Sequence, residues 1–120
     1  MTSATSINKG VVERYVDGFR KGNHQVILSC LTDDVTWEMP GYFALSGKVA
    51  FDNEIENDAS EGHPELNITR LIEEDDTVVA VGTVRVALKA GGVLDAMFCD
   101  VFDFKNGKIQ RLVTYQVNKT

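Results

Sequence analysis

The second half of the chain consists almost entirely of strand-like segments joined by very short connections. Four segments rich in β-branched and aromatic residues cover positions 65–74, 77–89, 93–104 and 108–117. The last connection, Asn106-Gly107, is a dipeptide typical of a tight hairpin turn. Because parallel neighbours need a long crossover, segments this closely spaced are expected to pair antiparallel. This half of the chain therefore predicts a four-stranded antiparallel sheet.

The first half of the chain is predicted to be mainly helical. From Ser6, a candidate N-cap, apolar residues recur at helical spacing until Gly22, which is expected to end the first helix. Further helices at 26–31 and 48–57, a strand at 35–39 and a loop at 41–47 complete this half. Helices that come first and strands that come last predict an α+β fold, with the helices packed on one face of the sheet.

Length and composition restrict the kind of protein and its partners. A chain of 120 residues is expected to form one domain, residues 1–120, with a hydrophobic core of its own. Its net charge of −6, with both signs interspersed, argues against binding to nucleic acid or to an anionic membrane surface. Neither a membrane-spanning apolar run nor a signal-peptide pattern occurs, so a cytoplasmic location is expected.

A metal site is not expected, because the residues that usually bind metals are few and scattered. The only cysteines, Cys30 and Cys99, are far apart in the sequence and lie in apolar surroundings. The two histidines, His24 and His63, stand next to turn signals rather than beside other ligand types.

The stretch MFCDVFDF, residues 97–104, places a carboxylate among phenylalanines. In a strand, Asp100 shares a face with Phe98, Phe102 and Phe104, because side chains alternate between the two faces. Burying an unpaired charge costs free energy, so the position of Asp100 on an apolar face calls for an explanation. One interpretation is a structural polar group with a hydrogen-bond partner. The other is a proton-handling group in a dry pocket, with its pKa raised by desolvation.

Four segments, taken in order and spacing, resemble the nuclear-transport-factor-2-like (NTF2-like) superfamily, and within it the SnoaL-like and ketosteroid-isomerase-like branch. They are VVERYVDGFRKGN (11–23), LTDDVTWEMPG (31–41), LSGK (45–48) and FCDVFDFKNGKIQRLVTY (98–115). The resemblance implies a cystatin/NTF2-like roll. In this fold a cone-shaped, curved, mixed or antiparallel sheet wraps around three N-terminal helices. The interior of the cone is often a ligand cavity.

Comparison with ketosteroid isomerases implies candidate catalytic residues. Those enzymes use a tyrosine on the first helix, matched here by Tyr15, and an aspartic acid on a late strand, matched by Asp100. Their aspartate base ends the first strand, where this chain has Met39, which cannot accept a proton. Glu38 is adjacent, but it is expected to point to the other face unless a bulge intervenes. Steroid isomerisation itself is therefore not expected.

Further residues are predicted to line the pocket. Trp37 and Met39 share a strand face, and Tyr42 in the glycine-flanked loop either closes the pocket mouth or only pins the loop. The family register directs alternate residues of the last strand inward. The predicted substrate-binding set is Trp37, Met39, Tyr42, Phe98, Phe102, Leu112, Thr114 and Gln116.

Two functions are consistent with this sequence. The first is an isomerase-like or polyketide-cyclase-like enzyme that transfers protons on a small hydrophobic carbonyl or polycyclic substrate, without a metal or organic cofactor. The second is a non-catalytic ligand-binding or association module of the same fold. In either case a homodimer is expected, because the outer sheet face would otherwise expose apolar residues. They are Met97, Val101, Val113 and Tyr115.

Overall fold

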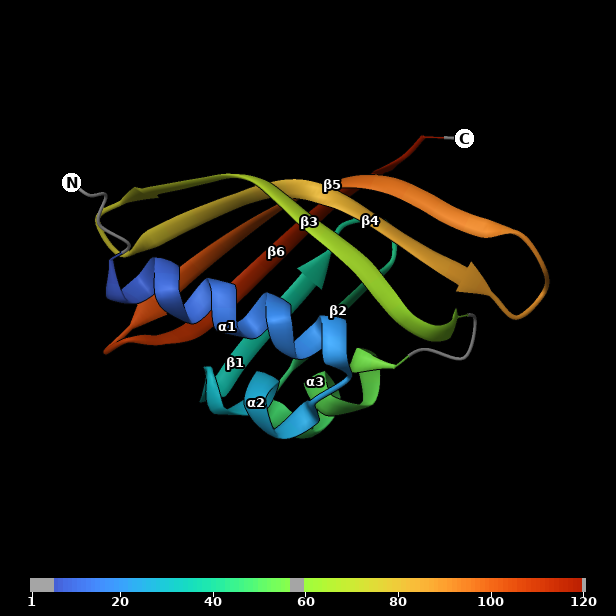
Figure 1. Ribbon diagram of the computed structural model, residues 1–120. Coiled ribbons are helices and arrows are strands. Elements are labelled where there is room, and N and C mark those ends of the chain that lie inside the picture. The colour runs from blue at the N-terminus through green and yellow to red at the C-terminus, as the bar shows by residue number, and fades with distance from the viewer. Residues whose placement is uncertain (1–5, 57–59, 120) are drawn as a thin grey trace.

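The computed structural model describes residues 6–56 and 60–119 and has the predicted α+β architecture (Figure 1). Its elements in chain order are α1 (Ile7–Lys21), α2 (His24–Ser29), β1 (Leu31–Met39), β2 (Phe43–Ser46), α3 (Lys48–Ile55), β3 (Ser60–Glu74), β4 (Thr77–Leu88), β5 (Val93–Lys105) and β6 (Lys108–Asn118). None of the helices in these ranges is long and apolar enough to cross a membrane.

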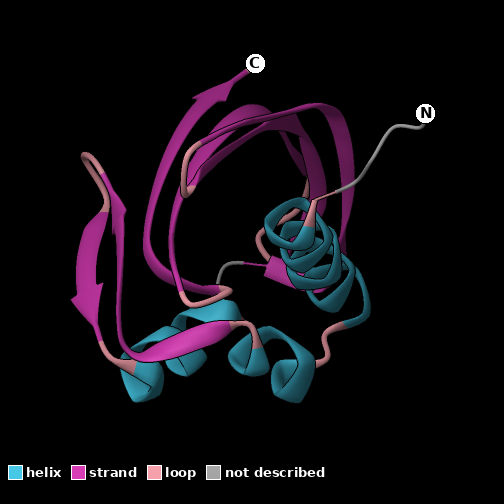
Figure 2. Ribbon diagram, turned by 90° about the vertical axis from the view of Figure 1, so that its left-hand side faces the viewer, coloured by secondary structure: helices cyan, strands magenta, loops and turns pink. Residues whose placement is uncertain are grey.

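The six strands form one mixed, strongly curved sheet in the order β2-β1-β6-β5-β4-β3. The four C-terminal strands pair antiparallel, as predicted, whereas β1 lies parallel to β6. Figure 2 shows the sheet curling around α1, with the two shorter helices below it. The curvature leaves a concave face that one long helix covers in part.

Local signals at the two ends of α1 explain its limits. The Ser6 side chain accepts a hydrogen bond from the Lys9 backbone N–H at 3.0 Å, which satisfies one of the free donors of the first turn. Gly22 ends the helix with φ of 63°, a left-handed conformation in which a glycine carries no Cβ penalty. Both predicted caps are confirmed.

The segment 41–47 was expected to be a loop, and this expectation is wrong. Residues Phe43–Ser46 form β2, which pairs antiparallel with β1 and places Trp37 opposite Leu45. The outer edge of β1 would otherwise expose a row of unpaired backbone groups, and β2 covers it. The two glycines, at positions 41 and 47, mark only the ends of this hairpin segment, each with φ of 88°.

Several other element boundaries differ from the sequence-based expectation. Helix α2 covers His24–Ser29 rather than 26–31, and β3 begins at Ser60 rather than at 65. Strand β1 begins at Leu31 rather than at 35, because a register shift between Leu31 and Thr36 accommodates the exposed pair Asp33-Asp34. Helix α3 ends at Ile55, and its predicted last residue, 57, lies outside the described residues.

The core lies between α1 and the concave face of the sheet. Val12, Tyr15 and Val16 form the buried stripe of α1. The Tyr15 ring packs edge-on against Phe102 of β5, with the ring centroids 5.4 Å apart. Phe51 of α3 is fully buried, and its ring stacks on Trp37 of β1 at 4.5 Å. These aromatic contacts fix α1 and α3 relative to the sheet.

His24 joins α2 to α3 through both of its ring nitrogens. Nδ1 lies 2.5 Å from Asp52 Oδ1, and Nε2 lies 2.6 Å from Glu56 Oε1. The hydrogen bond with Asp52, followed by that with Glu56, raises the pKa of His24. This bridge holds α3 against the rest of the helical layer.

Candidate functional site

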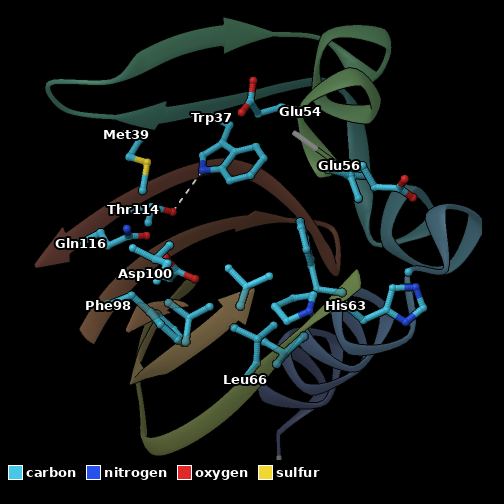
Figure 3. Close-up of a pocket in the computed structure, with 18 of the residues that line it drawn as sticks. Trp37, Met39, Glu54, Glu56, His63, Leu66, Phe98, Asp100, Thr114 and Gln116 are labelled. Carbon is cyan, nitrogen blue, oxygen red and sulfur yellow. Dashed lines mark hydrogen bonds between the residues drawn. The ribbon is translucent and has the colours of Figure 1, made fainter. Parts of the chain in front are cut away.

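A cavity of about 600 Å³ lies between the concave face of the sheet and the C-terminal half of α1. This volume is in the range of small-molecule sites. Side chains from α1, α3 and all six strands line it. In Figure 3, Asp100, Thr114, Gln116, Met39 and Phe98 lie at one side of the cavity, and Glu56 and His63 lie at the other.

Asp100 contributes a buried carboxylate oxygen to the cavity wall. Within the described part of the chain, its Oδ1 atom is buried without a hydrogen-bond partner, although another part of the residue stays accessible. Burial raises the pKa of Asp100 from its ordinary 3.8 to about 7, against the opposing effect of a hydrogen bond from the Thr114 hydroxyl. Both protonation states of this group are therefore populated near neutral pH.

Thr114 lies opposite Asp100 on β6 and also faces the cavity. Its Oγ1 accepts a hydrogen bond from Trp37 Nε1 at 3.0 Å, which links β1 to β6 through side chains (Figure 3). Trp37 lines the cavity together with Met39, so the expected shared face of these two residues is confirmed.

Tyr15 lines the same cavity from α1 and is almost fully buried. Because Tyr15 and Asp100 are both polar residues on otherwise apolar faces, the sequence predicts that they share a hydrogen bond, directly or through one water. Within the described part of the chain, the two side chains make no direct hydrogen bond, and the aromatic neighbours Phe19, Phe51 and Phe102 surround the Tyr15 ring. Burial raises the pKa of Tyr15 well above its ordinary value of 10.0, and the charge of Asp100 raises it further. The Tyr15 hydroxyl thus stays protonated and can act only as a neutral group.

Met39 occupies the position at which a ketosteroid isomerase carries its base. Its side chain lines the cavity, whereas Glu38 is exposed and is not among the lining residues. The register from Thr36 to Glu38 against β6 is continuous, so no bulge turns the Glu38 carboxylate inward. The cavity wall is therefore apolar at this one position, although Asp100, Thr114 and Gln116 lie on the same side of the cavity.

Three residues of the predicted substrate-binding set lie elsewhere. Tyr42 is 65% exposed in the turn between β1 and β2 and is outside the cavity lining. Phe102 and Leu112 do point inward, but both are buried in the core. The reason is the position of α1, because the Tyr15 ring packs on Phe102 and covers this part of the concave face, whereas the cavity lies over the neighbouring part. Phe98, two residues before Asp100, does line the cavity.

Several titratable residues at the cavity edge were not predicted from the sequence. Glu54 lies in α3 and Glu56 directly follows it, Glu61 and His63 come from the start of β3, and Lys89 comes from the turn after β4. No local pattern marks them, because three separate segments meet only in the folded chain. Among the described residues, no group of three or more His, Cys, Asp or Glu side chains could hold a metal ion.

The sequence of this chain matches the family model of the SnoaL-like domain over residues 12–112. The chain belongs to the SnoaL-like family. The matched region includes Tyr15, Met39 and Asp100. No curated protein matches the sequence.

Solved structures share the fold of this SnoaL-like protein over nearly its whole length. An NTF2-like protein of unknown function from Burkholderia pseudomallei K96243 is 23% identical, with a TM-score of 0.82 over 92% of this chain and 90% of that one. A putative polyketide cyclase from Xanthomonas campestris pv. campestris is 22% identical, with a TM-score of 0.82 over 91% and 89%. An LEH-like epoxide hydrolase from M. tuberculosis is 18% identical, with a TM-score of 0.82 over 94% and 84%. The predicted NTF2-like superfamily is thereby confirmed.

Proposed function

We propose that this SnoaL-like protein is an isomerase- or cyclase-type enzyme that transfers protons on a small hydrophobic carbonyl or polycyclic substrate. The observation that carries this proposal is the unpartnered Oδ1 of Asp100 in the cavity wall. A buried polar atom normally has a hydrogen-bond partner, and a bound ligand would supply one here.

The pKa of Asp100 suits this task. A general acid or base works best when its pKa lies near the operating pH, and that of Asp100 is about 7. In its ionised form Asp100 takes a proton from the carbon next to a carbonyl group. The resulting acid then returns that proton to a carbon or oxygen of the same substrate.

The negative charge that develops on the carbonyl oxygen needs a donor in the same cavity. The Tyr15 hydroxyl is protonated, buried and part of the cavity lining, so it is the candidate for this role. Apolar groups such as Met39 and Phe98 also line the wall near Asp100, beside the polar Thr114 and Gln116, and they favour a flat hydrophobic substrate. A polyketide cyclase and an epoxide hydrolase among the similar structures support small-molecule chemistry on this fold.

Exchange of carbon-bound hydrogen tests the proposal. With 1-tetralone in D₂O, NMR should show deuterium entering the position next to the carbonyl about tenfold or more faster than without protein. Asp100→Leu and Asp100→Asn should both abolish this acceleration. Exchange at the background rate with the unmodified protein, or acceleration that survives Asp100→Leu, would overturn the proposal.

Ligand binding separates the enzyme from a second candidate, a non-catalytic ligand-binding module. The observation that favours this candidate is the thioether of Met39 at the position of the base. Both candidates predict that 2-naphthol binds, and that Asp100→Asn weakens binding less than Asp100→Leu, because the amide keeps a hydrogen-bond donor. Binding of this kind without any acceleration of exchange would favour the second candidate.

A further inference from the structure

Both ring nitrogens of His24 face carboxylate oxygens, and this geometry determines the charge of the ring. Nδ1 lies 2.5 Å from Asp52 Oδ1, and Nε2 lies 2.6 Å from Glu56 Oε1. An ionised carboxylate can only accept a hydrogen bond, so each ring nitrogen must carry a hydrogen atom. An imidazole ring with both hydrogen atoms is a cation. The structure therefore shows a protonated His24 between two carboxylates, an arrangement that we call the His24 bridge.

Helix α3 depends on contacts of this kind to keep its last turn in place. It has only eight residues, and a helix this short is marginal in water without tertiary support. Its N-cap, Gly47, makes no side-chain hydrogen bond, and Glu56 at its C-cap has an extended backbone. Asp52 and Glu56 are four positions apart, which is about one helical turn. The His24 bridge therefore fastens the C-terminal end of α3 to the start of α2.

The same helix contributes to one wall of the cavity. Ile55 and Glu56 line the cavity, and the fully buried Phe51 stacks on the cavity-lining Trp37 at 4.5 Å. In Figure 3, Glu56 lies on the side of the cavity opposite Asp100. The shape of that side of the cavity therefore depends on where α3 is held.

We infer that His24 is a positioning residue, whose protonated ring holds α3 and Glu56 where they complete the wall of the ligand cavity. When the ring loses one hydrogen atom, the bare nitrogen and the carboxylate opposite it both present lone pairs and repel each other. Glu56 is the carboxylate expected to turn away, because its side chain is 69% exposed, whereas that of Asp52 is 42% exposed. A ligand should therefore bind less tightly after this loss.

Charged groups from three elements surround His24. The hydrogen bond with Asp52, followed by that with Glu56, raises the pKa of His24, so the bridge is formed below this pKa and released above it. From β3, His63 packs against Gly22, where an added Cβ atom would lie 2.6 Å from its Nε2 atom. The end of α1 carries two cations that contact one carboxylate of the same helix, and these three residues are Arg20, Lys21 and Asp17.

Two measurements on the free protein test the His24 bridge. NMR of the imidazole ring gives the pKa of His24, and amide hydrogen exchange gives the protection factors of α3 at each pH. Protection of α3 should fall about threefold or more as the pH rises through the pKa of His24. His24→Leu has no donor and should show the low protection at every pH. His24→Lys keeps a cation with three donors that does not titrate near neutral pH, and should keep the high protection without a step.

The carboxylate side of the bridge offers a matched pair of variants. Glu56→Gln replaces the charge by an amide that can accept or donate, so its contact survives when His24 is neutral. This variant should lower the pKa of His24 by about 0.5 pH units or more and reduce the step in the protection of α3. Glu54→Gln removes the same charge from a residue of α3 that also lines the cavity but lies outside the bridge. It should change the pKa of His24 less than Glu56→Gln does.

Ligand binding tests the link from the bridge to the cavity, and the probe is 2-naphthol. The background is Asp100→Asn, because Asp100 itself titrates at about 7. The affinity should fall about threefold or more between about pH 6 and about pH 8.5, and His24→Lys should remove this fall.

Three results would overturn the inference. They are constant protection of α3 across the titration of His24, a step that survives His24→Lys, and an affinity for 2-naphthol that does not follow the step. The inference rests on the proposed function for the role of the cavity, but its failure is distinguishable. If 2-naphthol does not bind at any pH, the proposed function fails, whereas the protection of α3 still decides whether His24 holds this helix.

Discussion

Asp100 and Thr114 face each other where β5 pairs with β6, and among the described residues no hydrogen-bond partner reaches the buried Oδ1 of Asp100 in the cavity wall. Burial makes the neutral acid the favoured form in the folded protein, which raises the pKa of Asp100 to about 7. In the unfolded chain the same group releases its proton near 3.8. Folding and protonation of Asp100 are therefore coupled.

The first prediction is that the free energy of unfolding falls as the pH rises. A carboxyl group whose pKa is raised on folding contributes stability that is fully present below about 3.8 and is lost as the pH rises through about 7. The difference between these pKa values corresponds to up to about 4 kcal/mol. Urea unfolding at several pH values from 4 to 8 should show this decline, and Asp100→Asn should reduce it.

Asp33→Asn is the matched control for that experiment. It removes the same charge from a fully exposed side chain, and should leave the pH dependence close to that of the unmodified protein. The prediction fails if Asp100→Asn and the unmodified protein lose stability in parallel between pH 4 and 8.

The second prediction is that the unmodified protein shows little or no steroid isomerase activity. Met39 leaves the isomerase base position without a proton acceptor. Asp100 stands where those enzymes hold their oxyanion donor, so a steroid bound in the same way would present its carbonyl oxygen, and not its acidic carbon, to Asp100. Met39→Asp is expected to confer a trace of isomerisation if the cavity admits water. The measurement is the absorbance of the conjugated enone formed from a standard steroid substrate.

Glu38 provides the control for this second prediction. Because its side chain is exposed on the outer face, Glu38→Gln should change nothing in the activity of Met39→Asp. Robust isomerisation by the unmodified protein that Glu38→Gln removes would mean that this carboxylate does reach the cavity.

The third prediction concerns Gly82, where β3 passes close to β4. A Cβ atom at this position would lie 2.2 Å from the backbone oxygen of Asn67 and 2.8 Å from the Phe98 ring. Gly82→Ala should therefore lower the free energy of unfolding by about 1–3 kcal/mol and displace a residue of the cavity wall. Chemical denaturation measures the loss, and weaker binding of 2-naphthol reports the displaced Phe98.

Gly18→Ala is the comparison for Gly82→Ala. Its added Cβ would meet the Ile27 side chain at 2.8 Å, and alanine favours a helix over glycine. Because a side chain moves more easily than backbone, Gly18→Ala is expected to lower the free energy of unfolding by less than Gly82→Ala does. If Gly82→Ala lowers the free energy of unfolding no more than Gly18→Ala does, the backbone contact between β3 and β4 relaxes to admit the added Cβ atom.

The fourth prediction is a homodimer formed through the outer face of the sheet. Met97 and Tyr115 are 50% and 52% exposed on neighbouring strands, and large exposed apolar side chains on one face favour association. Val101 is half-buried, and Val113 is only 6% exposed, so Val113 contributes less to this surface than expected. We expect light scattering to give the mass of a dimer at micromolar concentration.

Tyr115→Glu should shift that equilibrium to the monomer, because it places a charge in the centre of the contact. Val49→Glu, at a residue that is 78% exposed on α3 and away from the sheet, is the matched control and should leave the dimer intact. A monomeric mass for the unmodified protein would refute the prediction.

The caps, the strand alternation and the short turns of this chain are local, and they were sufficient to predict most of the fold. Ser6 and Gly22 limit α1 through contacts within a few residues, and alternation alone places Asp100 on the inward face of β5. On β1, alternation separates Met39 from Glu38, and the resemblance to ketosteroid isomerases predicted that Met39 is the residue that faces inward, as it does. The sequence did not predict β2, because its pairing partner is the free edge of β1, and that edge exists only once the sheet has formed.

Which inward-facing residues meet a cavity was decided only by the tertiary structure. Phe98 and Phe102 share one face of one strand, yet α1 covers Phe102 and leaves Phe98 at the hollow end. The two-residue alternation of a strand identifies which side chains share a face of the sheet. It does not identify what packs against that face, because this depends on the curvature of the six strands and on where α1 crosses them. The hydrogen bond of Trp37 to Thr114, between residues 77 positions apart, depends on the same long-range packing and therefore has no signature in the sequence.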